Sequence, residues 1–538
     1  LVIGMVFVAV FTVIALRAAE VALFGTATAR APIARTHGTA PPVPVRADIV
    51  DRNGRLLATM LDSPSLYANP RQILDAGEAT RKLTAALPDL DGAEILAKLS
   101  SGKGFVWLKR HLTPQQEFAV NQLGIPGLQF EHEERRVYPY GALTSHVVGY
   151  TGIDNDGFAG VERGLDRVLN GRAEPLQLSI DVRLQYVLHD ELQQVVDDFT
   201  AKGGDGLIMN VNTGEVLAMV SLPDFDPAHP GAPDPAHPEI SPADRMFNRV
   251  TLGDYEIGSV FKIFTTAMGL DSGATTMTGT FDATHPIRIG RFTISDYHGK
   301  HRVESVPEIL MYSSNIGEAK IALAVGAERQ QEYLRRFGLL SQPTIEIDEV
   351  GKPHFPAHWR EVNVMTIGFG HGISETPLQI ASAGSALVNG GILRPATLVK
   401  LPSGYAPQGR QVIAPKTSEE MRKLLRLVVE YGTGEMVGAK GYVVGGKTGT
   451  ADKVVGRRYA ERKLLSSFLG AFPMTDPKYL VLVMVDEPHP NKASHGYATA
   501  GWTAAPAVGR VIERIAPLLG IAPVDEASPA IEHALMVD

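Results

Sequence analysis

The segment Ser259-Val260-Phe261-Lys262 places a serine and a lysine three residues apart. On a helix, residues at that spacing lie on one face, one turn from each other. If the helix begins at the serine, its backbone N–H groups and dipole favour negative charge developing at the hydroxyl. A lysine held neutral one turn on could then take the serine's proton. The spacing alone is weak evidence, because Ser100-Ser101-Gly102-Lys103 repeats it, so a nucleophile at Ser259 requires partners elsewhere.

Two further polar motifs supply candidate partners. Ser313-Ser314-Asn315 offers a hydroxyl and an amide, which can relay a proton and hold a substrate peptide group. Lys447-Thr448-Gly449 follows the apolar run Tyr442-Val443-Val444, a pattern typical of an edge strand. Its lysine offers positive charge, and its glycine removes a Cβ where a substrate backbone would pass. Alone, these motifs fit a helix cap and a turn, whereas all three in this order favour an active site.

The elements that must position these residues lie in residues 176–520. Strand patterns at both ends of this region, with helical patterns between them, predict an α+β domain whose sheet pairs distant segments. The turn between the first two strands is Asn212-Thr213-Gly214. The candidate elements are a helix at 184–199, strands at 207–211, 216–220, 468–472 and 479–486, and a helix at 504–519.

The N-terminal segment predicts a membrane anchor. Residues 1–16 carry no charge, and Arg17 and Glu20 follow them. Because this run is apolar, we expect residues 1–24 to be a single transmembrane helix. The chain does not begin with Met, so we expect that helix to be truncated at its start. The alternative is a cleaved signal peptide with Ala27-Thr28-Ala29 as its cleavage box. Residues 25–45, which contain several prolines and no hydrophobic period, are expected to be a linker, and either reading puts the remainder outside the cytoplasm.

Residues 46–175 are expected to form a separate module without a catalytic cluster. Within it, Asp51-Arg52-Asn53-Gly54 followed by Leu56-Leu57-Ala58 predicts a hairpin whose turn needs a positive φ. At the other end of the chain, residues 521–538 contain proline and follow no clear period. We expect them to be a loosely ordered tail.

Composition narrows the classes of function. The 538 residues are 44% hydrophobic and 20% charged, which is typical of a globular chain of two or three domains. A net charge of −8 without a basic stripe argues against nucleic acid as the partner. The absence of cysteine excludes disulfides, thiolate metal sites and a cysteine nucleophile. Histidine pairs such as His298 and His301 lack the further ligands that zinc needs, so we expect no metal site.

A phosphate-binding loop is the alternative from a different class of enzyme. Residues 441–448 (GYVVGGKT) satisfy the pattern GxxxxGK[ST], and residues 482–487 could pass for a Walker B strand. Such a loop needs a strand before its first glycine and a helix that begins at the lysine. Here the β-branched residues lie inside the loop, and Gly449 follows where the helix should begin. We therefore disfavour nucleotide binding.

The three motifs together are typical of penicillin-binding proteins and class A β-lactamases. Residues 255–262 (YEIGSVFK) resemble the block YEPGSTFK of class B penicillin-binding proteins, with Ile257 where the family usually has proline. Ala47 likewise stands where the family usually has glycine, and neither change removes a reacting group. Around Lys447 the chain most resembles the division-specific septal transpeptidases of this class. The other segments that carry the resemblance are residues 46–58, 136–152, 206–227, 368–372, 376–379, 440–451 and 458–459.

The resemblance implies a domain organisation. Residues 176–520 would form the serine D,D-transpeptidase domain, an α+β fold with an antiparallel sheet flanked by helices. A mixed α/β pedestal or dimerisation-type module at 46–175 and the transmembrane helix at 1–24 would precede it. No metal or organic cofactor would be needed.

The resemblance also implies the roles of the reacting groups. Ser259 would attack the carbonyl of a terminal D-Ala-D-Ala peptide bond and become acylated, with Lys262 as its general base. Ser313 would pass a proton to the leaving D-alanine. Asn315 would bind the donor peptide and position Lys262, and Lys447 would add positive charge to the site.

Substrate binding would fall to the strand that carries the third motif. Thr448 would recognise the terminal carboxylate, and Gly449 would leave room for the peptide. The backbone N–H groups of Ser259 and Thr450 would form the oxyanion hole. An amine from a neighbouring stem peptide would then take the acyl group, and β-lactams would leave Ser259 blocked.

The expected setting follows from the same family. The catalytic domain would lie in the periplasm, held to the inner membrane by a single span. Its partners would be peptidoglycan stem peptides, β-lactam antibiotics, a membrane glycosyltransferase and other divisome proteins, and no nucleic acid. The alternatives within related chemistry are an elongation-specific class B transpeptidase and a β-lactam sensor or β-lactamase. A non-catalytic scaffold is a third alternative, which the intact serine, lysine and asparagine set disfavours.

Overall fold

The computed structural model describes residues 46–290, 292–455 and 458–537. The expected anchor at 1–24 and linker at 25–45 lie outside these residues. Within them, no helix has the length and apolar character needed to span a bilayer.

The N-terminal module is built around one long strand, β2 (Leu56–Ala68). It pairs with β1 (Ile49–Val50) through the predicted hairpin, whose turn contains Gly54 at a φ of 83°. Further along, β2 pairs with β3 (Val106–Lys109) and β4 (Leu128–Val137). Helices α2 (Ala76–Ala86), α3 (Gly92–Leu99) and α4 (Pro114–Asn121) share an apolar core with these strands.

Arg46 anchors the start of the described chain within this module. Its side chain is fully buried, and its Nε lies 2.5 Å from Glu162 Oε2. Its Nη1 lies 2.7 Å from Asp166 Oδ1, and Arg136 contacts the other oxygen of Glu162 at 2.7 Å. A buried charge is tolerated when it is paired in this way.

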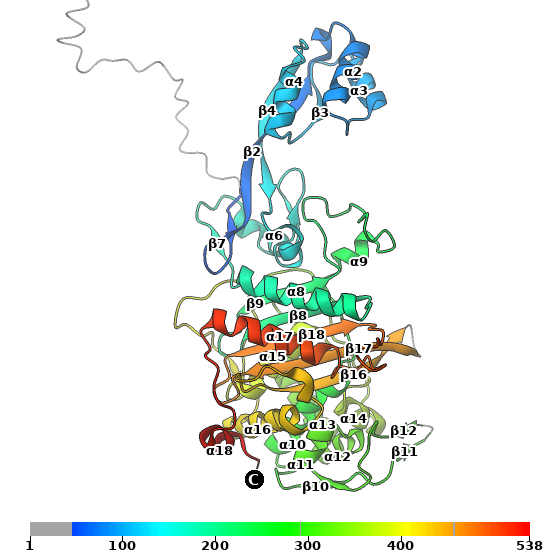
Figure 1. Cartoon of the computed structure of the whole chain (residues 1–538), viewed down its shortest axis with the longest axis vertical. Helices are drawn as coiled ribbons and strands as arrows, with labels where there is room; N and C mark the ends of the chain where they lie inside the picture. Colours follow the sequence, from blue (N-terminus) through cyan, green and yellow to red (C-terminus); the bar gives the residue numbers. More distant parts are fainter. Residues whose placement is uncertain (1–45, 291, 456–457, 538) are drawn as a thin grey trace, which may run out of the picture. The chain divides into compact units, whose positions relative to one another are not determined.

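The second domain contains the predicted antiparallel sheet, in the order β16-β17-β18-β8-β9. Strands from both ends of the domain sequence therefore lie side by side, as the α+β prediction requires (Figure 1). The strand expected at 479–486 has those bounds, whereas the one expected at 468–472 begins ten residues earlier, at Arg458. The strands are β8 (Gly203–Asn210), β9 (Val216–Leu222), β16 (Gly445–Val455), β17 (Arg458–Phe472) and β18 (Tyr479–Asp486).

Helices cover both faces of this sheet (Figure 1). On β18, Val481 and Val483 face the core shared with α8 (Val182–Asp198) and α17 (Ala504–Ile515). The alternate residues Leu480, Leu482 and Met484 face the core that contains α10, α15 and α16. This period of two, apolar on both faces, is typical of a strand buried between two layers. The helices of the second layer include α10 (Lys262–Asp271), α15 (Pro377–Val388) and α16 (Pro415–Tyr431).

Strand β16 ends the sheet. It pairs with β17 along its length, and among the described residues no strand pairs with its other side. The prediction of an edge strand carrying Lys447-Thr448-Gly449 is confirmed, although the strand begins at Gly445 rather than in the preceding apolar run.

The C-terminal tail differs from the expectation. Residues 529–535 form helix α18, and Leu535 is buried. Glu526 lies 2.7 Å from Arg426 and accepts a hydrogen bond from the Gly441 backbone at 2.5 Å. The tail is held by these charged and apolar contacts, which its irregular sequence does not reveal.

Shorter elements complete the fold. In the first module they are η1 (Pro70–Gln72), η2 (Gly141–Thr144), α5 (Ser145–Val148), β5 (Tyr150–Thr151), β6 (Gly157–Ala159), α6 (Gly160–Gly164), α7 (Asp166–Leu169) and β7 (Leu176–Gln177). In the second domain they are α9 (Pro242–Met246), η3 (Gly258–Phe261), β10 (Thr280–Asp282), β11 (Ile287–Ile289), β12 (Phe292–Ile294), β13 (Val303–Ser305), α11 (Val306–Tyr312), α12 (Asn315–Val325), α13 (Ala327–Arg336), α14 (Glu361–Gly368), β14 (Ile392–Leu393), β15 (Arg410–Gln411), η4 (Glu435–Val437) and η5 (Pro517–Leu519).

Candidate active site

Ser259 lies in a single 3₁₀ turn, η3, that leads directly into α10. The α-helix therefore begins at Lys262 and not at the serine, which corrects the geometry expected from sequence. The Lys262 backbone N–H donates to the Ser259 carbonyl, so the two residues are three apart on a 3₁₀ turn. Side chains at that spacing are nearly eclipsed on a 3₁₀ helix. The turn thus places the Ser259 and Lys262 side chains on one face, with a 3₁₀ turn in place of the α-helical turn expected from sequence.

Close backbone packing holds this turn. Gly370 has a φ of 82°, and a Cβ built on it would lie 2.2 Å from the Gly258 carbonyl oxygen. A Cβ on Gly449 would lie 2.6 Å from the Ile257 carbonyl oxygen. The turn is therefore clamped between the loop after α14 and strand β16, at points where only glycine fits.

Lys262 points into the interior, where its side chain is fully buried. Its Nζ donates to the Ser313 carbonyl oxygen at 2.5 Å and to Ser313 Oγ at 3.0 Å. Burial lowers the pKa of Lys262 to about 8, although the negative charges of Glu318, Asp296 and Glu304 oppose that shift. The neutral form of Lys262 that a general base requires is therefore more populated near physiological pH than in an ordinary lysine.

Ser313 joins two helices. It follows α11, and its backbone adopts the left-handed conformation, with a φ of 61° and a ψ of 45°. Left-handed backbone is uncommon for a residue other than glycine and is often found at functional sites. At Ser313 this left-handed backbone carries a hydroxyl that contacts the amines of both Lys262 and Lys447.

Asn315 is the first residue of α12. Its side-chain amide donates to the Ser295 carbonyl oxygen at 2.9 Å, so the structure directs it toward the 295–296 segment. Asp296 accepts hydrogen bonds from the Asn315 backbone N–H at 2.5 Å and from the Ser314 hydroxyl at 2.9 Å. This carboxylate caps the helix start, where negative charge is favoured. The sequence prediction missed Asp296, because it lies 18 residues from Ser314 in an irregular segment.

Lys447 reaches Ser313 from the sheet. Its Nζ lies 3.0 Å from Ser313 Oγ and 3.0 Å from the Thr448 carbonyl oxygen. The side chain is fully buried, and burial together with the charge of Lys262 lowers the pKa of Lys447 well below its ordinary range. Its lowered pKa reduces the positive charge that Lys447 is expected to add to the site.

The remaining predicted residues lie along β16. The Thr448 hydroxyl donates to Thr433 Oγ1 at 2.7 Å, a partner that sequence reasoning did not identify. Thr450 Oγ1 accepts a hydrogen bond from the Ala500 backbone N–H at 3.1 Å. A Cβ on Gly258 would lie 3.1 Å from the Thr450 carbonyl oxygen, so the serine turn and this part of the strand are neighbours.

A polar cluster, which we call the rim, joins three segments through Tyr459, Glu256 and His371. The Tyr459 hydroxyl donates to Glu256 Oε2 at 2.9 Å, and His371 Nδ1 lies 3.4 Å from that hydroxyl. Burial, with a contribution from the charge of Lys262, lowers the pKa of His371 to about 4, so the imidazole is neutral at pH 7. Sequence reasoning did not assign a role to His371.

The other sequence patterns that could indicate a functional site do not form one in the structure. The lysine of Ser100-Ser101-Gly102-Lys103 is exposed, and Ser100 only ends helix α3. Residues 445–455 form a strand that runs through Lys447, where a phosphate-binding loop would begin a helix. In the described part of the chain, no group of three or more metal-ligating side chains could hold a metal ion.

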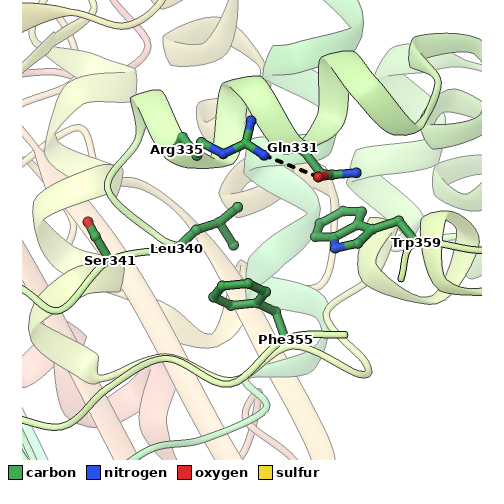
Figure 2. A pocket seen from close by; sticks show the side chains of 6 residues that line it. All are labelled: Gln331, Arg335, Leu340, Ser341, Phe355 and Trp359. Atoms are coloured by element: carbon green, nitrogen blue, oxygen red, sulfur yellow. Dashed lines mark hydrogen bonds between the residues drawn. The ribbon is translucent and has the colours of Figure 1, made fainter. Parts of the chain in front are cut away.

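A separate hollow lies away from these residues. Figure 2 shows Gln331 and Arg335 of α13 above Leu340, Phe355 and Trp359. The cavity has a volume of about 340 Å³ and contains none of the predicted site residues.

Two family models match the chain. The dimerisation domain of penicillin-binding proteins matches residues 41–194, and the transpeptidase domain of penicillin-binding proteins matches residues 205–511. The second match includes every residue predicted for the site.

Named relatives agree with these matches. The probable peptidoglycan D,D-transpeptidase FtsI of Caulobacter vibrioides is 43% identical over 88% of this chain and 82% of its own length. The probable peptidoglycan D,D-transpeptidase PenA of Neisseria gonorrhoeae is 31% identical over 90% of this chain and 86% of its own length. The peptidoglycan D,D-transpeptidase FtsI of Escherichia coli K12 is 28% identical over 89% of this chain and 84% of its own length.

Solved structures share the fold. Penicillin-binding protein 3 of Mycobacterium tuberculosis in complex with ampicillin superposes with a TM-score of 0.70 at 22% identity, over 90% of this chain and 98% of that one. The transpeptidase domain of penicillin-binding protein 3 from Burkholderia pseudomallei gives 0.57 at 30% identity, over 65% of this chain and 98% of that one. With a dimerisation domain, a transpeptidase domain and the three motifs in order, the chain belongs to the class B penicillin-binding proteins.

Proposed function

We propose that this chain is a serine D,D-transpeptidase that cross-links the stem peptides of septal peptidoglycan. One observation carries the proposal: Lys262 and Lys447 each lie 3.0 Å from the hydroxyl of Ser313, beside the turn that holds Ser259. A serine, a lysine of lowered pKa and a connecting hydroxyl are the parts that acyl transfer needs.

The first step is acylation. Ser259 Oγ attacks the carbonyl carbon between the two D-alanines while Lys262 takes its proton. The peptide C–N bond breaks, an ester forms on Ser259, and the terminal D-alanine leaves as an amine. Ser313 passes the proton to that nitrogen. Its hydroxyl suits this task, because one hydroxyl can accept from one amine while it donates to the other.

The second step transfers the acyl group. The amine of a neighbouring stem peptide attacks the ester, an amide bond forms, and Ser259 regains its proton. The negative charge that develops on the carbonyl oxygen in both steps is stabilised by the backbone N–H groups of Ser259 and Thr450. Among the described residues no strand pairs with the outer side of β16, so its main-chain groups are available to the donor peptide, with Thr448 facing the peptide's carboxylate. The position of the missing Cβ of Gly449 is taken by the Ile257 carbonyl oxygen, so this glycine makes room for the serine turn and not, as the sequence suggested, for the peptide.

Asn315 is assigned to the donor peptide rather than to Lys262. Its amide already bonds to the Ser295 carbonyl, which fixes its orientation and leaves one N–H and the carbonyl oxygen for a peptide group.

The septal role, the single inner-membrane span and the periplasmic location belong to the same proposal. The 43% identity to a protein named FtsI supports the first, and the charge-free run at residues 1–16 supports the second. The first module would dock a membrane glycosyltransferase and other divisome proteins. Unchanged co-purification of such partners after removal of residues 46–170 would count against that docking role.

The test is covalent labelling of the purified full chain with a fluorescent penicillin. Label should be lost in Ser259→Ala and kept in Ser100→Ala, which alters the chance copy of the motif. Equal labelling of Ser259→Ala would overturn the mechanism. A label that is released within minutes would instead favour a β-lactamase. A septal position of a fluorescent fusion would support division, and a lateral-wall position would support elongation.

A further inference from the structure

Glu318 is a buried acid directly behind the catalytic motif. It lies on α12 one turn after Asn315, and it is 0% exposed. Burying an ionised carboxylate is costly unless it is paired. Among the described residues, no cation lies within ion-pair distance of Glu318, and its Oε2 atom has no hydrogen-bond partner. The position of this unpaired acid on α12, the helix that begins with Asn315, therefore needs an explanation.

Its other oxygen links two helices. Glu318 Oε1 accepts a hydrogen bond from the Thr266 hydroxyl at 2.7 Å. Thr266 lies four residues after Lys262 on α10, so it occupies the same helix face one turn further on. The bond therefore ties α10, which begins with the general base, to α12, which begins with Asn315. On the far side, α14 approaches with Gly368, where an added Cβ would lie 3.1 Å from the Glu318 carbonyl oxygen.

The charges that face Glu318 are both cationic. They are the amines of Lys262 and Lys447, which when protonated act on Glu318 through space from α10 and β16. Burial nevertheless raises the pKa of Glu318 to about 8. In turn, Glu318 is the first of the negative charges that oppose the lowering of the pKa of Lys262, ahead of Asp296 and Glu304.

The other two acids are less suited to this role. Asp296 is engaged by the backbone at the start of α12. Glu304 lies on β13, and burial raises its pKa as well. Among the described residues, neither acid forms a hydrogen bond with the helix that carries Lys262, whereas Glu318 accepts one from Thr266.

We propose that Glu318 is a positioning residue for acylation: it fastens α10 to α12 through Thr266 and, once ionised, lies behind Lys262 as a counter-charge. The inference rests on the proposed function, because it assumes that Lys262 accepts the proton of Ser259. It adds a residue outside the three motifs to the machinery of that step.

The test compares three variants of the full chain. Glu318→Gln keeps an oxygen for Thr266 but removes the charge. Thr266→Val removes the hydroxyl at constant shape. Thr265→Val is the matched control, since Thr265 is equally buried on the same helix but its hydroxyl has no partner among the described residues. The measurement is the second-order rate constant for acylation by a fluorescent penicillin between pH 6 and pH 10.

We expect the wild-type rate to rise with pH as Lys262 loses its proton. Without the carboxylate, the ammonium form of Lys262 is less favoured, so in Glu318→Gln the rise should move to lower pH by about one unit. Thr266→Val should move it in the same direction by less, because the lost hydrogen bond favours the protonated acid. Thr265→Val should match the wild type.

An unchanged pH profile in both Glu318→Gln and Thr266→Val would overturn the inference. If Glu318→Gln does not fold, as judged by circular dichroism, Thr266→Val decides alone. Failure of the proposed function itself would be distinguishable, because labelling would then persist in Ser259→Ala whatever the profiles show.

Discussion

Lys262 and Lys447 share one hydrogen-bond partner, since the Nζ atom of each lies 3.0 Å from Ser313 Oγ. Both side chains are fully buried, and two ammonium ions on one hydroxyl would repel each other. This favours a state in which at least one amine is neutral. The arrangement explains how a basic amine can be held beside the Ser313 hydroxyl.

Removal of the shared hydroxyl should therefore disable proton transfer. Ser313→Ala is expected to lower the rate of acylation by fluorescent penicillin by roughly 10²- to 10⁴-fold. Ser314→Ala is the matched control. It removes a helix cap, which costs about 1 kcal/mol of stability, and should leave acylation near the wild-type rate. Comparable rates for the two variants would contradict the relay.

The pH dependence of acylation should follow Lys262. Burial lowers its pKa to about 8, and the neutral amine is the active form, so the rate should rise through pH 8 and level off above it. The reverse trend, a rate that falls between pH 7 and pH 9, would show that the base is not this lysine. Stopped-flow measurement with a chromogenic β-lactam provides the profile.

Gly370 should be intolerant of a side chain. Its φ is 82°, and a Cβ would lie 2.2 Å from the Gly258 carbonyl oxygen, so Gly370→Ala must displace the serine turn. A displacement of about 1 Å can cost on the order of 100-fold in rate. The control is Gly404→Ala, where φ is 77° but no atom lies within 4 Å of the added Cβ. A normal acylation rate in Gly370→Ala would refute the clamp.

Arg46 should dominate the stability of the first module. Arg46→Ala leaves Glu162 with one cation fewer in a fully buried position, and the expected loss is about 3–5 kcal/mol. Arg163→Ala breaks an exposed pair with Asp348 and should cost under about 1 kcal/mol. Urea unfolding of each variant, followed by tryptophan fluorescence, measures the difference. Equal losses would contradict the importance of burial.

Glu375 should make stability depend on pH. It is 0% exposed, neither oxygen has a hydrogen-bond partner among the described residues, and burial raises its pKa well above the ordinary value of 4.5. Above pH 4.5 the Glu375 carboxyl loses its proton in the unfolded chain but keeps it in the folded chain. Up to the folded-state pKa, the contribution of Glu375 to the free energy of unfolding then falls by about 1.4 kcal/mol per pH unit.

Glu375→Gln removes this penalty, so its stability relative to the wild type should grow from pH 5 to pH 8 in thermal unfolding. A difference that does not change with pH would show that the carboxyl is ionised in the folded chain.

The sequence was most informative where residue type and period carry the signal. Strand 479–486 is predicted with its observed bounds because both of its faces are apolar. The three motifs predict one shared site, and in the structure Lys262 and Lys447 both contact Ser313. The start of α10 was misplaced by one 3₁₀ turn, because residues at i and i+3 share a face in both kinds of helix.

What the sequence could not reveal are contacts between irregular segments. Asp296 and Thr433 reach the site through tertiary packing, and no spacing or local period connects them to the motifs. Glu318 lies one helical turn after Asn315, but its contact with Thr266 of α10 depends on how the two helices pack. Glu318 in particular stands on an apolar stretch of helix, where a single acid gives no indication of which neighbour it will meet.

The open edge of β16 has a consequence for inhibitor escape. A substitution exchanges a side chain but leaves the main-chain N–H and C=O groups of a strand in place, proline excepted. A drug that docks along this edge would therefore contact atoms that point mutation cannot delete. Resistance would have to arise in the surroundings of the strand, through the loop at Gly370 or the rim formed by Tyr459 and Glu256, where changes shift the strand's neighbours without altering its own hydrogen-bonding groups.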